Sequence, residues 1–437
     1  MRLYPNNPHY VEFRGKPTLL VSSAEHYGSV LNADFDYLPY LDNLRGYGLN
    51  QLRLFSGTYR EIPGEFGIQD NNLAPRPEAF LSPWAKTPDG KFDLTKDNPD
   101  YFARLHDFLQ KASERDIVVE FVLFCFWYNP PLWEVSPMHP SNNVQGIGPL
   151  DKEQVYTLEN NDLLPVQEEL VRRLVRELNG YDNLYYEVCN EPYSRHDHTA
   201  YLDWQHHIAE VIAETESVLP NKHLIAINYQ NRTQRIPFAH PAVSICNFHY
   251  AQPEAVKENY HLDRVISYDE TGFQGQQADP YRREAWQFML SGGGIFSNLD
   301  YSYTVQHPDG TAPMEGNTPG YGGEDLRQQL SFMRRFLEEA QVWNMRPYNE
   351  MFAWNAGRVN AQVICDPGRL YLIYFPESRV GITHMLGLPV GQYRFSWINP
   401  VYGTTFQTFE QNHPGNMLRV DTPMHTGDLL LRIDRVE

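Results

Sequence analysis

From Thr18 to Leu337, short apolar runs alternate with longer stretches whose apolar residues recur three and four positions apart. The short runs predict strands, whereas the spacing in the longer stretches predicts amphipathic helices. At Asn98-Pro99, for example, an N-cap residue and a first-turn proline precede a helical stretch. Strands are expected at residues 18–23, 49–55, 117–126, 185–191, 223–228, 243–248, 264–270 and 294–299.

This alternation of strand and helix is almost complete, with a weak fifth helix. It predicts an α/β fold of the (β/α)8 TIM-barrel type. Three connections, at residues 56–97, 129–162 and 301–323, are far longer than is usual after a barrel strand. Because such loops lie on the catalytic face of a barrel, we expect them to form walls around a site.

After Pro347 the pattern changes to short alternating apolar runs, separated by turns such as Asp366-Pro367-Gly368. This spacing predicts a small antiparallel β-sandwich of about ninety residues. A chain of 437 residues also exceeds the size at which one hydrophobic core stops growing. We therefore expect two domains, a catalytic barrel at residues 1–345 and a C-terminal β-sandwich at residues 346–437.

The composition narrows the classes of partner. A formal net charge of −19 opposes nucleic-acid binding, which depends on neutralising phosphates, and favours a neutral or cationic substrate.

No stretch approaches the ~20 apolar residues of a membrane span. The chain opens without a signal-peptide segment, so we expect a cytoplasmic protein, or a secreted or periplasmic one if a leader was removed. The four cysteines are expected to be buried thiols, and no oligomeric state is indicated.

Two of the predicted strands end in glutamate. Glu191 follows one strand within Asn190-Glu191-Pro192, and Glu270 ends another within Glu270-Thr271-Gly272. In a barrel of parallel strands the carboxyl ends face the active site, so both carboxylates are expected on that face. The alternative is that both are surface acids that merely follow strands.

These two motifs, about eighty positions apart, resemble those of the clan A glycoside hydrolases, the group that contains family 5 cellulases and mannanases. The resemblance spans roughly residues 10–340 and implies that Glu191 is the acid/base and Glu270 the nucleophile. Carboxyl groups about 5 Å apart select the retaining route, and two such acids cannot both ionise easily. We therefore expect a raised pKa for Glu191, and a hydrogen bond from Asn190 to the sugar 2-hydroxyl.

Other residues are expected to support the site or bind substrate. Arg53 lies within an apolar strand and needs a partner, for which Glu187 is the best candidate; the resemblance implies that Arg53 supports the carboxylates. The clan often places a His and a Tyr one apart near the end of the sixth strand, where they contact the substrate and the nucleophile. Here His249 and Tyr250 are adjacent instead, so which of them reaches the site stays open. The eighth strand lacks the tryptophan usual in family 5. Further candidates at strand ends are His26, Trp127, Tyr128 and Asn298, with loop core as the alternative for the two aromatic residues.

Neither a metal nor another cofactor is expected. The histidines at residues 195–198 and 206–207 are interpreted as the start and exposed face of a helix, because no Glu or Cys stands at a zinc-site spacing. No P-loop is present, and no GxGxxG motif follows a strand.

The expected partner is a carbohydrate, and the expected activity is retaining hydrolysis of β-linked oligo- or polysaccharides. Long loops favour a pocket for short chains or chain ends, with β-glucosidic linkages slightly favoured over mannosidic or galactosidic ones. Its expected stacking surfaces are Trp84, Trp127, Trp133 and Tyr303. The alternatives are an endo-acting β-glucanase or mannanase with an open groove, an inactive carbohydrate-binding barrel, or a metal-assisted or aldol-type barrel enzyme.

Overall fold

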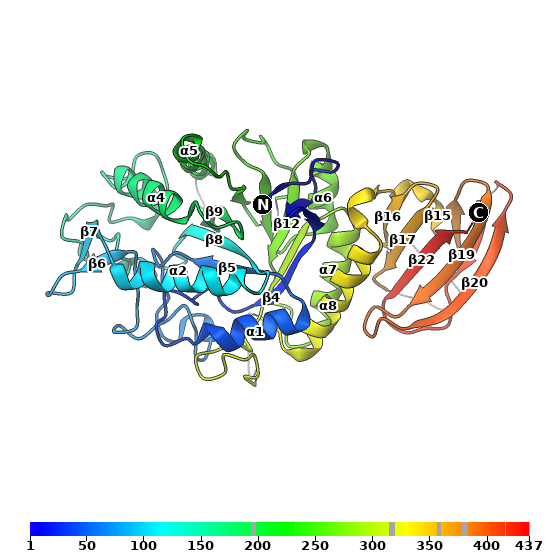
Figure 1. Ribbon diagram of the computed structural model, residues 1–437, viewed down its shortest axis with the longest axis horizontal. Helices are drawn as coiled ribbons and strands as arrows, with labels where there is room; N and C mark the ends of the chain where they lie inside the picture. The colour runs from blue at the N-terminus through cyan, green and yellow to red at the C-terminus, as the bar shows by residue number, and fades with distance from the viewer. Residues whose placement is uncertain are drawn as a thin grey trace.

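The computed structural model describes residues 1–193, 198–231, 233–313, 320–355, 360–377, 383–415 and 417–436. The larger of its two regions is built around an eight-stranded parallel sheet with the order β4-β13-β12-β11-β10-β9-β8-β5 (Figure 1). The strands are β4 Leu20–Ala24, β5 Gln51–Phe55, β8 Val118–Cys125, β9 Leu184–Asn190, β10 Ile225–Tyr229, β11 Ile245–His249, β12 Val265–Glu270 and β13 Ile295–Leu299. All eight predicted strands are present, and most begin one or two residues later than predicted.

The two end strands of this sheet meet at Asn50 and nearly close it into a barrel. The Asn50 side chain accepts a hydrogen bond from the backbone N–H of Val21 (3.1 Å) and donates one to the carbonyl of Leu19 (2.8 Å). The backbone N–H of Asn50 also donates to the Val21 carbonyl at 3.2 Å. One side chain thus pairs the backbone where β4 meets β5. The predicted (β/α)8 barrel is confirmed.

Helices cover the outside of the barrel (Figure 1). The first begins at Asp36, whose side chain accepts from the N–H of Leu38, and ends at Gly48 in the left-handed conformation. No helix lies between β10 and β11 in the described part of that connection, in keeping with the weak fifth helix of the sequence. The helices are α1 Tyr37–Tyr47, α2 Pro99–Ser113, α3 Pro130–Glu134, α4 Leu164–Leu178, α5 His198–Ser217, α6 Pro253–Asn259, α7 Ala278–Leu290 and α8 Glu324–Glu339. Short 3-10 turns occur at Glu65–Gly67, Lys152–Gln154, Tyr260–Leu262, Val342–Asn344 and Asn349–Met351.

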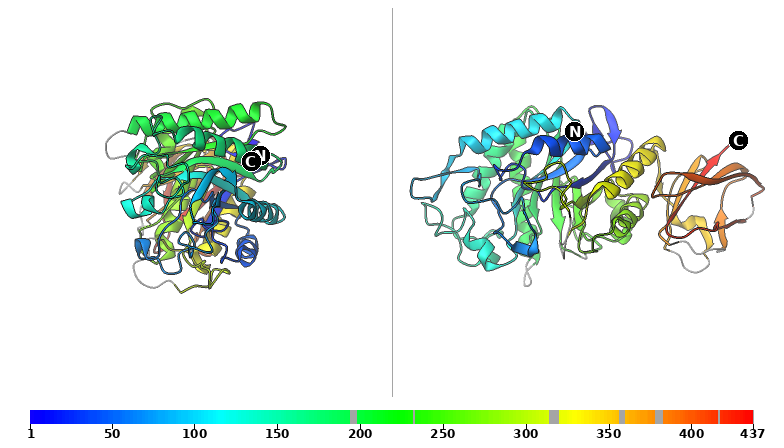
Figure 2. Two further views of the ribbon diagram at one scale, coloured as in Figure 1. Left: turned by 90° about the vertical axis from the view of Figure 1, so that its left-hand side faces the viewer. Right: turned by 90° about the horizontal axis from the view of Figure 1, so that it is seen from below.

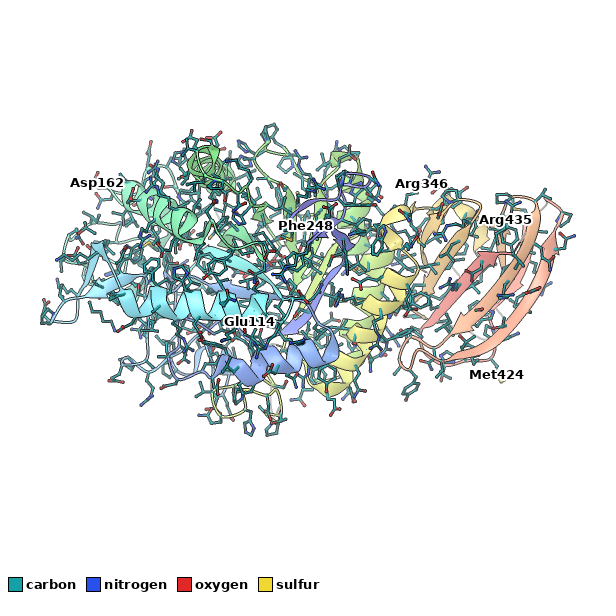
Figure 3. The ribbon with its side chains drawn as sticks, in the orientation of Figure 1. Glu114, Asp162, Phe248, Arg346, Met424 and Arg435 are labelled. Atoms are coloured by element: carbon teal, nitrogen blue, oxygen red, sulfur yellow. The ribbon has the colours of Figure 1, made fainter. Side chains whose placement is uncertain are left out.

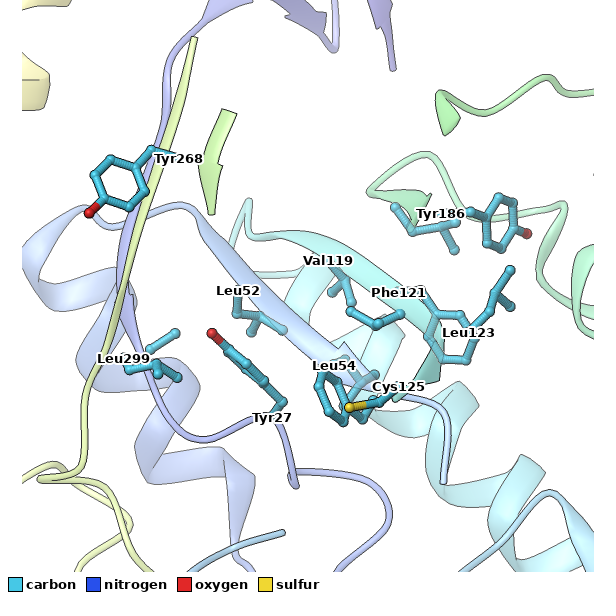
Figure 4. Packing of buried hydrophobic residues seen from close by; sticks show 14 of the residues in the cluster. Tyr27, Leu52, Leu54, Val119, Phe121, Leu123, Cys125, Tyr186, Tyr268 and Leu299 are labelled. Carbon is cyan, nitrogen blue, oxygen red and sulfur yellow. The ribbon is translucent and has the colours of Figure 1, made fainter. Parts of the chain in front are cut away.

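The barrel strands carry apolar residues outward and polar residues inward. Leu52 and Leu54 of β5 belong to the large hydrophobic cluster under the helices, together with residues of β8 such as Val119 and Phe121 (Figure 4). Gln51 of β5 points to the other side of the sheet and donates a hydrogen bond to Glu120 of β8 at 3.0 Å inside the barrel. This alternation follows from the period of two along a strand. It builds a polar barrel interior beneath the catalytic face.

A three-stranded N-terminal sheet, which the sequence did not predict, covers the opposite end of the barrel. Its strands are β1 Arg2–Leu3, β2 Val11–Phe13 and β3 Lys16–Thr18. Val11 and Phe13 pack in one cluster with residues at the starts of the barrel strands, including Leu20 and Val118. Strands of two or three residues are too short to show a clear alternation, which explains the omission.

The C-terminal region contains two antiparallel sheets, and the predicted β-sandwich is confirmed. One sheet has the order β14-β16-β17-β22-β19-β20, and the other has the order β15-β18-β21. Both contribute to one core, with Val363 and Tyr371 from the first and Leu386 and Leu418 from the second. The strands are β14 Arg346–Pro347, β15 Phe352–Asn355, β16 Gln362–Asp366, β17 Leu370–Phe375, β18 Thr383–Gly387, β19 Gly391–Ile398, β20 Thr405–His413, β21 Met417–Asp421 and β22 Leu429–Arg435.

Helices α7 and α8 separate the barrel from the sandwich (Figures 1 and 2). Arg282 of α7 makes a bidentate ion pair with buried Asp428, at 2.8 and 3.0 Å. The ring of Trp286 stacks on that of Tyr374. Arg346 stands where the sandwich begins, while Phe248 lies within the barrel (Figure 3). The predicted domain boundary falls between α8 and β14 and stays a prediction.

One hairpin, β6 Trp84–Lys86 with β7 Phe92–Asp97, folds within the long connection after β5. It gives that loop internal structure.

In the described part of the chain, every helix is too short or too polar to cross a lipid bilayer.

Candidate active site

Glu191 and Glu270 lie together at the carboxyl ends of the barrel strands. Glu270 is the last residue of β12, and Glu191 directly follows β9. A carboxylate oxygen of each lies within 4.8 Å of the other and of a ring nitrogen of His249. The two side chains are almost buried, with residue exposures of 7% for Glu191 and 6% for Glu270. Two strands that are distant in the sequence thus deliver two carboxylates to one point.

Arg53 lies directly beneath this pair and is fully buried. Its Nη1 donates to Glu270 Oε2 at 3.0 Å, and its Nη2 donates to Asn190 Oδ1 at 2.9 Å and to Glu187. Its Nε lies 3.3 Å from Asp269 Oδ2. The predicted ion pair between Arg53 and Glu187 is present. A single guanidinium therefore connects strands β5, β9 and β12 under the site.

The carboxyls deeper in the barrel bind protons more tightly than ordinary glutamates. Burial raises the pKa of Glu120 well above its usual value, with Asp269 and Glu187 adding to the effect. Burial also raises the pKa of Glu187, although Arg53 opposes the shift. These raised pKa values reflect the cost of burying several carboxyls around a single guanidinium.

His249 makes an ion pair with Glu191, with Nδ1 and Oε1 2.8 Å apart, and its Nε2 lies 3.4 Å from Asp269. Burial alone would lower the pKa of His249, but Glu270, Asp269 and Glu191 outweigh it and raise that pKa well above the ordinary value. Burial alone would raise the pKa of Glu191, but hydrogen bonding and charge from His249, with bonds from Asn231 and Tyr128, lower it. The raised pKa expected for Glu191 is therefore wrong. The expectation omitted a cationic His249 at the end of β11.

Glu270 receives hydrogen bonds from three donors. Tyr250 donates to Oε1 at 2.8 Å, while Tyr27 (3.2 Å) and Arg53 (3.0 Å) donate to Oε2. His249 and Tyr250 therefore both reach the site, although their strongest contacts are to different carboxylates. The β-strand register shifts at His249, and Tyr250 has a positive φ of 51°, which lets adjacent residues serve the same site.

A cavity of about 270 Å³ opens above the two carboxylates. Of the residues expected at the site, His26, Tyr128, Asn190, Glu191, Tyr250 and Glu270 line it, while Arg53 and His249 lie behind the wall. The remaining lining residues are Tyr27, Phe55, Tyr59, Glu61, Phe66, Leu73, Cys125, Asn231, Phe273, Leu299 and Tyr301.

Trp127 was expected to stack on sugar, and the structure contradicts this. It is fully buried, with its ring 4.5 Å from that of Trp133 and stacked on Tyr156 at 5.0 Å. Because the side chain has no exposed surface, neither face is free for a sugar. The other expected stacking residues, Trp84, Trp133 and Tyr303, are also buried outside the cavity lining.

Asn298 does not line the cavity either. It is fully buried, and its amide donates to Ser23 Oγ (3.1 Å) and accepts from Thr271 Oγ1 (3.1 Å). It joins β13 to β4 and to the end of β12. Its role is to support the barrel rim rather than to bind substrate.

Several lining residues were missed because nothing local distinguishes them. Glu61 stands in a loop of varied composition, and Asn231 follows β10 without a motif.

Part of the cavity lining shares an unusual backbone conformation. Five lining residues other than glycine have positive φ angles, a costly conformation that tends to cluster at functional sites. They are Tyr27, Phe66, Glu191, Tyr250 and Phe273.

Among the residues that the structure describes, two sets of side chains have the spacing of metal ligands. They are Glu191 with His249 and Glu270, and Glu187 with His249 and Asp269. Both sets need a neutral imidazole, and His249 is held protonated. The charge of Arg53 also occupies the centre of the cluster. The donor set therefore fits a metal poorly, and the absence of a metal site stays a prediction.

The histidine-rich segment of the sequence is described only in part. Residues 194–197 lie outside the described residues. On α5, His207 pairs with Glu168 at 2.8 Å, and His206 stacks on His240. These contacts fit the interpretation of this segment as a helix face.

No family model matches the sequence, and no curated protein matches it. Solved structures do share its fold. A glycoside hydrolase family 5 structure from Bacteroides vulgatus ATCC 8482 has a TM-score of 0.66 at 11% identity, covering 99% of this chain and 93% of that chain. A structure named glycoside hydrolase has a TM-score of 0.64 at 10% identity, with 100% and 96% covered. A mutant family 5 mannosidase from Rhizomucor miehei has a TM-score of 0.51 at 13% identity, with 78% and 98% covered. These likenesses show the barrel fold and, in the first two, its C-terminal extension.

We predict that His249 stabilises the protein in a pH-dependent way. Because its folded-state pKa is raised, its stabilisation is complete below its ordinary value of 6.5 and is lost as pH rises through the folded-state pKa. Glu191, whose pKa is lowered, stabilises above its ordinary value of 4.5 and loses this effect as pH falls through its folded-state pKa. The decrease in the thermal unfolding midpoint that His249→Asn causes should therefore be largest between pH 4.5 and pH 6.5. It should become smaller at alkaline pH.

Tyr250→Phe serves as the matched control, because it removes a donor to Glu270 without removing a charge. Its effect on the midpoint should stay constant from pH 6 to about pH 9, below the tyrosine pKa of about 10. An equally constant effect in His249→Asn would contradict the charge assigned to that ring.

Proposed function

We propose that this protein is a retaining glycoside hydrolase that cleaves β-linked carbohydrates. The observation that carries the proposal is the close pair of Glu191 and Glu270, with oxygens within 4.8 Å, in the wall of a cavity at the barrel's catalytic face. Retaining enzymes hold their two carboxyls about 5–5.5 Å apart, whereas inverting enzymes leave about 6.5–9.5 Å for a water. Barrels of the same fold that are named family 5 glycoside hydrolases support the reaction class.

Glu270 is proposed as the nucleophile. A carboxylate has about four lone-pair sites, and the three donors Arg53, Tyr27 and Tyr250 occupy three of them. These bonds fix the orientation of the carboxylate and leave one site for attack on the anomeric carbon. A covalent glycosyl-enzyme forms as the bond to the leaving oxygen breaks.

Glu191 is proposed as the acid and then the base. It protonates the leaving oxygen in the first step and takes a proton from the attacking water in the second. His249, whose pKa is raised by its acidic neighbours, lies 2.8 Å from Glu191 Oε1 and can supply this proton. We infer that the two groups share this proton, so that substrate binding beside Glu191 draws it onto the carboxylate.

Asn190 is proposed to bind the sugar 2-hydroxyl. Its Oδ1 accepts from Arg53 at 2.9 Å, and its Nδ2 donates to Tyr128 Oη at 3.0 Å. The amide is therefore fixed in orientation at the cavity wall beside Glu191. A hydrogen bond from this group strengthens as the oxocarbenium-like transition state forms.

The charge of the cavity indicates an uncharged sugar. Glu61, Glu191 and Glu270 line it, its lining contains neither lysine nor arginine, and the lining histidine His26 already pairs with Glu61. A uronic acid or sulfated ring would be repelled, since a buried charge needs a partner of opposite sign. Neutral β-linked glucosides, mannosides or galactosides fit this environment.

The size of the cavity favours chain ends over internal sites. Its volume of about 270 Å³ lies just below the ~300–1,000 Å³ of pockets that enclose drug-sized ligands. The wall includes Tyr59, Phe66 and Leu73 from the long connection after β5. The competing proposals are an open endo-acting groove and an inactive carbohydrate-binding barrel.

Replacing Glu270 by Ala is predicted to abolish turnover of aryl β-glycosides, because the covalent intermediate can no longer form. Added azide should restore part of the activity and yield a glycosyl azide of inverted configuration, identified by NMR. Wild-type rates in Glu270→Ala would refute the nucleophile.

Replacing Glu191 by Ala is predicted to act unevenly on substrates. General acid catalysis typically contributes about 10²–10⁴-fold, and leaving groups of low pKa need little of it. Glu191→Ala should therefore lose far more activity on an alkyl or oligosaccharide substrate than on a dinitrophenyl glycoside. Equal losses in kcat/KM on both would argue against the acid role.

Product analysis on a long neutral β-glucan is predicted to show steady release of mono- or disaccharide with little fall in viscosity. The physical reason is the small cavity, which accommodates a chain end. Early release of mid-sized fragments with a rapid fall in viscosity would establish the open groove instead.

A further inference from the structure

A third carboxylate, Glu61, lies in the wall of the cavity and has no part in the chemistry above. Its residue exposure is only 2%. Oε1 lies 3.1 Å from His26 Nε2 and accepts from Tyr59 Oη at 3.3 Å, while Oε2 accepts from Asn71. Burying a carboxylate is costly, and here three groups, His26, Tyr59 and Asn71, hold it in one orientation.

His26 is the charged partner of Glu61. Burial alone would lower its pKa, but Glu61 and Glu270 outweigh that effect and raise it. The ring lies 5.1 Å from that of Tyr301 and lines the same cavity. Its Nδ1 is buried and has no hydrogen-bond partner in the described part of the chain. The pair therefore places a carboxylate and an imidazole side by side in the cavity wall.

The barrel order places this pair on the wall away from Glu191. His26 follows β4 and Glu61 follows β5, two strands that meet at the closure, whereas Glu191 follows β9. Glu191 protonates the leaving oxygen, so the leaving group lies at its wall. The sugar ring that remains on Glu270 then faces the pair of Glu61 and His26.

The loop that carries Glu61 is also held by bonds that do not involve the Glu61 side chain. The backbone N–H of Glu61 already donates to the Leu73 carbonyl at 2.7 Å. The Asn71 side chain accepts from the N–H of Leu73 at 2.8 Å in the same turn. Backbone and turn bonds therefore hold this segment together with the bonds of the carboxylate, and the experiments below have to separate a structural role from a binding role.

We propose that Glu61 and His26 bind the hydroxyls at positions 3, 4 or 6 of the non-reducing sugar ring, and so determine which sugar is hydrolysed. The inference rests on the proposed hydrolase function and adds the residues that select its substrate. Sugar hydroxyls donate to a carboxylate in charge-assisted hydrogen bonds, which are about twice as strong as neutral ones. Asn190 takes the 2-hydroxyl, so the two ends of the ring are bound by separate groups.

The first experiment uses the wild-type protein alone. kcat/KM is measured on nitrophenyl β-glycosides of the preferred sugar and on their 3-, 4- and 6-deoxy analogues. A site built around a hydroxyl can reject an analogue lacking it by as much as about 10⁴–10⁵-fold. We expect a loss of at least about 10²-fold for one or more analogues. A loss below about threefold for all three would overturn the role of Glu61 while leaving the hydrolase intact.

The second experiment compares Glu61→Gln with Glu65→Gln. Glu65 lies in the same connection, is absent from the cavity lining and accepts a hydrogen bond from Asn129 at 2.7 Å. Glu61→Gln should lose about 10²-fold in kcat/KM on the parent sugar and reduce the deoxy penalty to less than about tenfold. Glu65→Gln should keep the wild-type kcat/KM on the parent sugar and the wild-type deoxy penalty. Thermal unfolding midpoints of both variants check that each one is folded.

The outcomes separate the two proposals. A deoxy penalty that persists unchanged in Glu61→Gln overturns the assignment of Glu61, because the hydroxyl is then bound elsewhere. Absence of Glu270-dependent turnover on every β-glycoside overturns the hydrolase proposal, and the role of Glu61 with it.

Discussion

The charge of Arg53, buried at the centre of the barrel, is the constraint on which the candidate site depends. Its guanidinium reaches Glu187 and Asn190 from β9 and Asp269 and Glu270 from β12. Breaking a buried ion pair by removing one partner costs about 3–5 kcal/mol, so these strand ends are tied to a common position. The planar fork of Arg supplies several donors in fixed directions, which a lysine could not do. The separation of the two candidate catalytic carboxylates follows from this arrangement.

A second cation completes the charge pattern. His249 lies among Glu191, Asp269 and Glu270, and these neighbours keep it protonated despite its burial. Each candidate catalytic carboxylate therefore has a cation beside it: Arg53 pairs with Glu270, and His249 pairs with Glu191 and lies 3.5 Å from Glu270. The backbone accepts local strain to reach this geometry, since Glu191 and Tyr250 have φ angles of 46° and 51°. Strain of this kind persists only where surrounding contacts determine it, as the buried ion network does here.

The loops above the strand ends divide the aromatic residues into two groups. Trp127 packs on Trp133 and stacks on Tyr156 in the interior of the loop layer. Tyrosines and phenylalanines line the cavity instead, and Phe66 and Phe273 stand exposed at its edge. Large tryptophans bury more apolar area and support the walls, while tyrosine offers a hydroxyl to the cavity. The same walls carry Glu61 and His26, so the layer that encloses the cavity also supplies its polar contacts.

The sequence by itself determined the barrel, the sandwich and the position of Glu191 and Glu270 at strand ends. Those features depend on local periodicity, and strand alternation was enough to pair Arg53 with Glu187. The tertiary structure alone decided which aromatic residues face the cavity, why Glu191 has a lowered pKa, and that Glu61 belongs to the wall. Such properties arise from groups that are distant in the sequence, such as His249 beside Glu191 or Asn71 beside Glu61. The energies of burial and charge depend on this three-dimensional neighbourhood, and a pattern along the chain does not contain it.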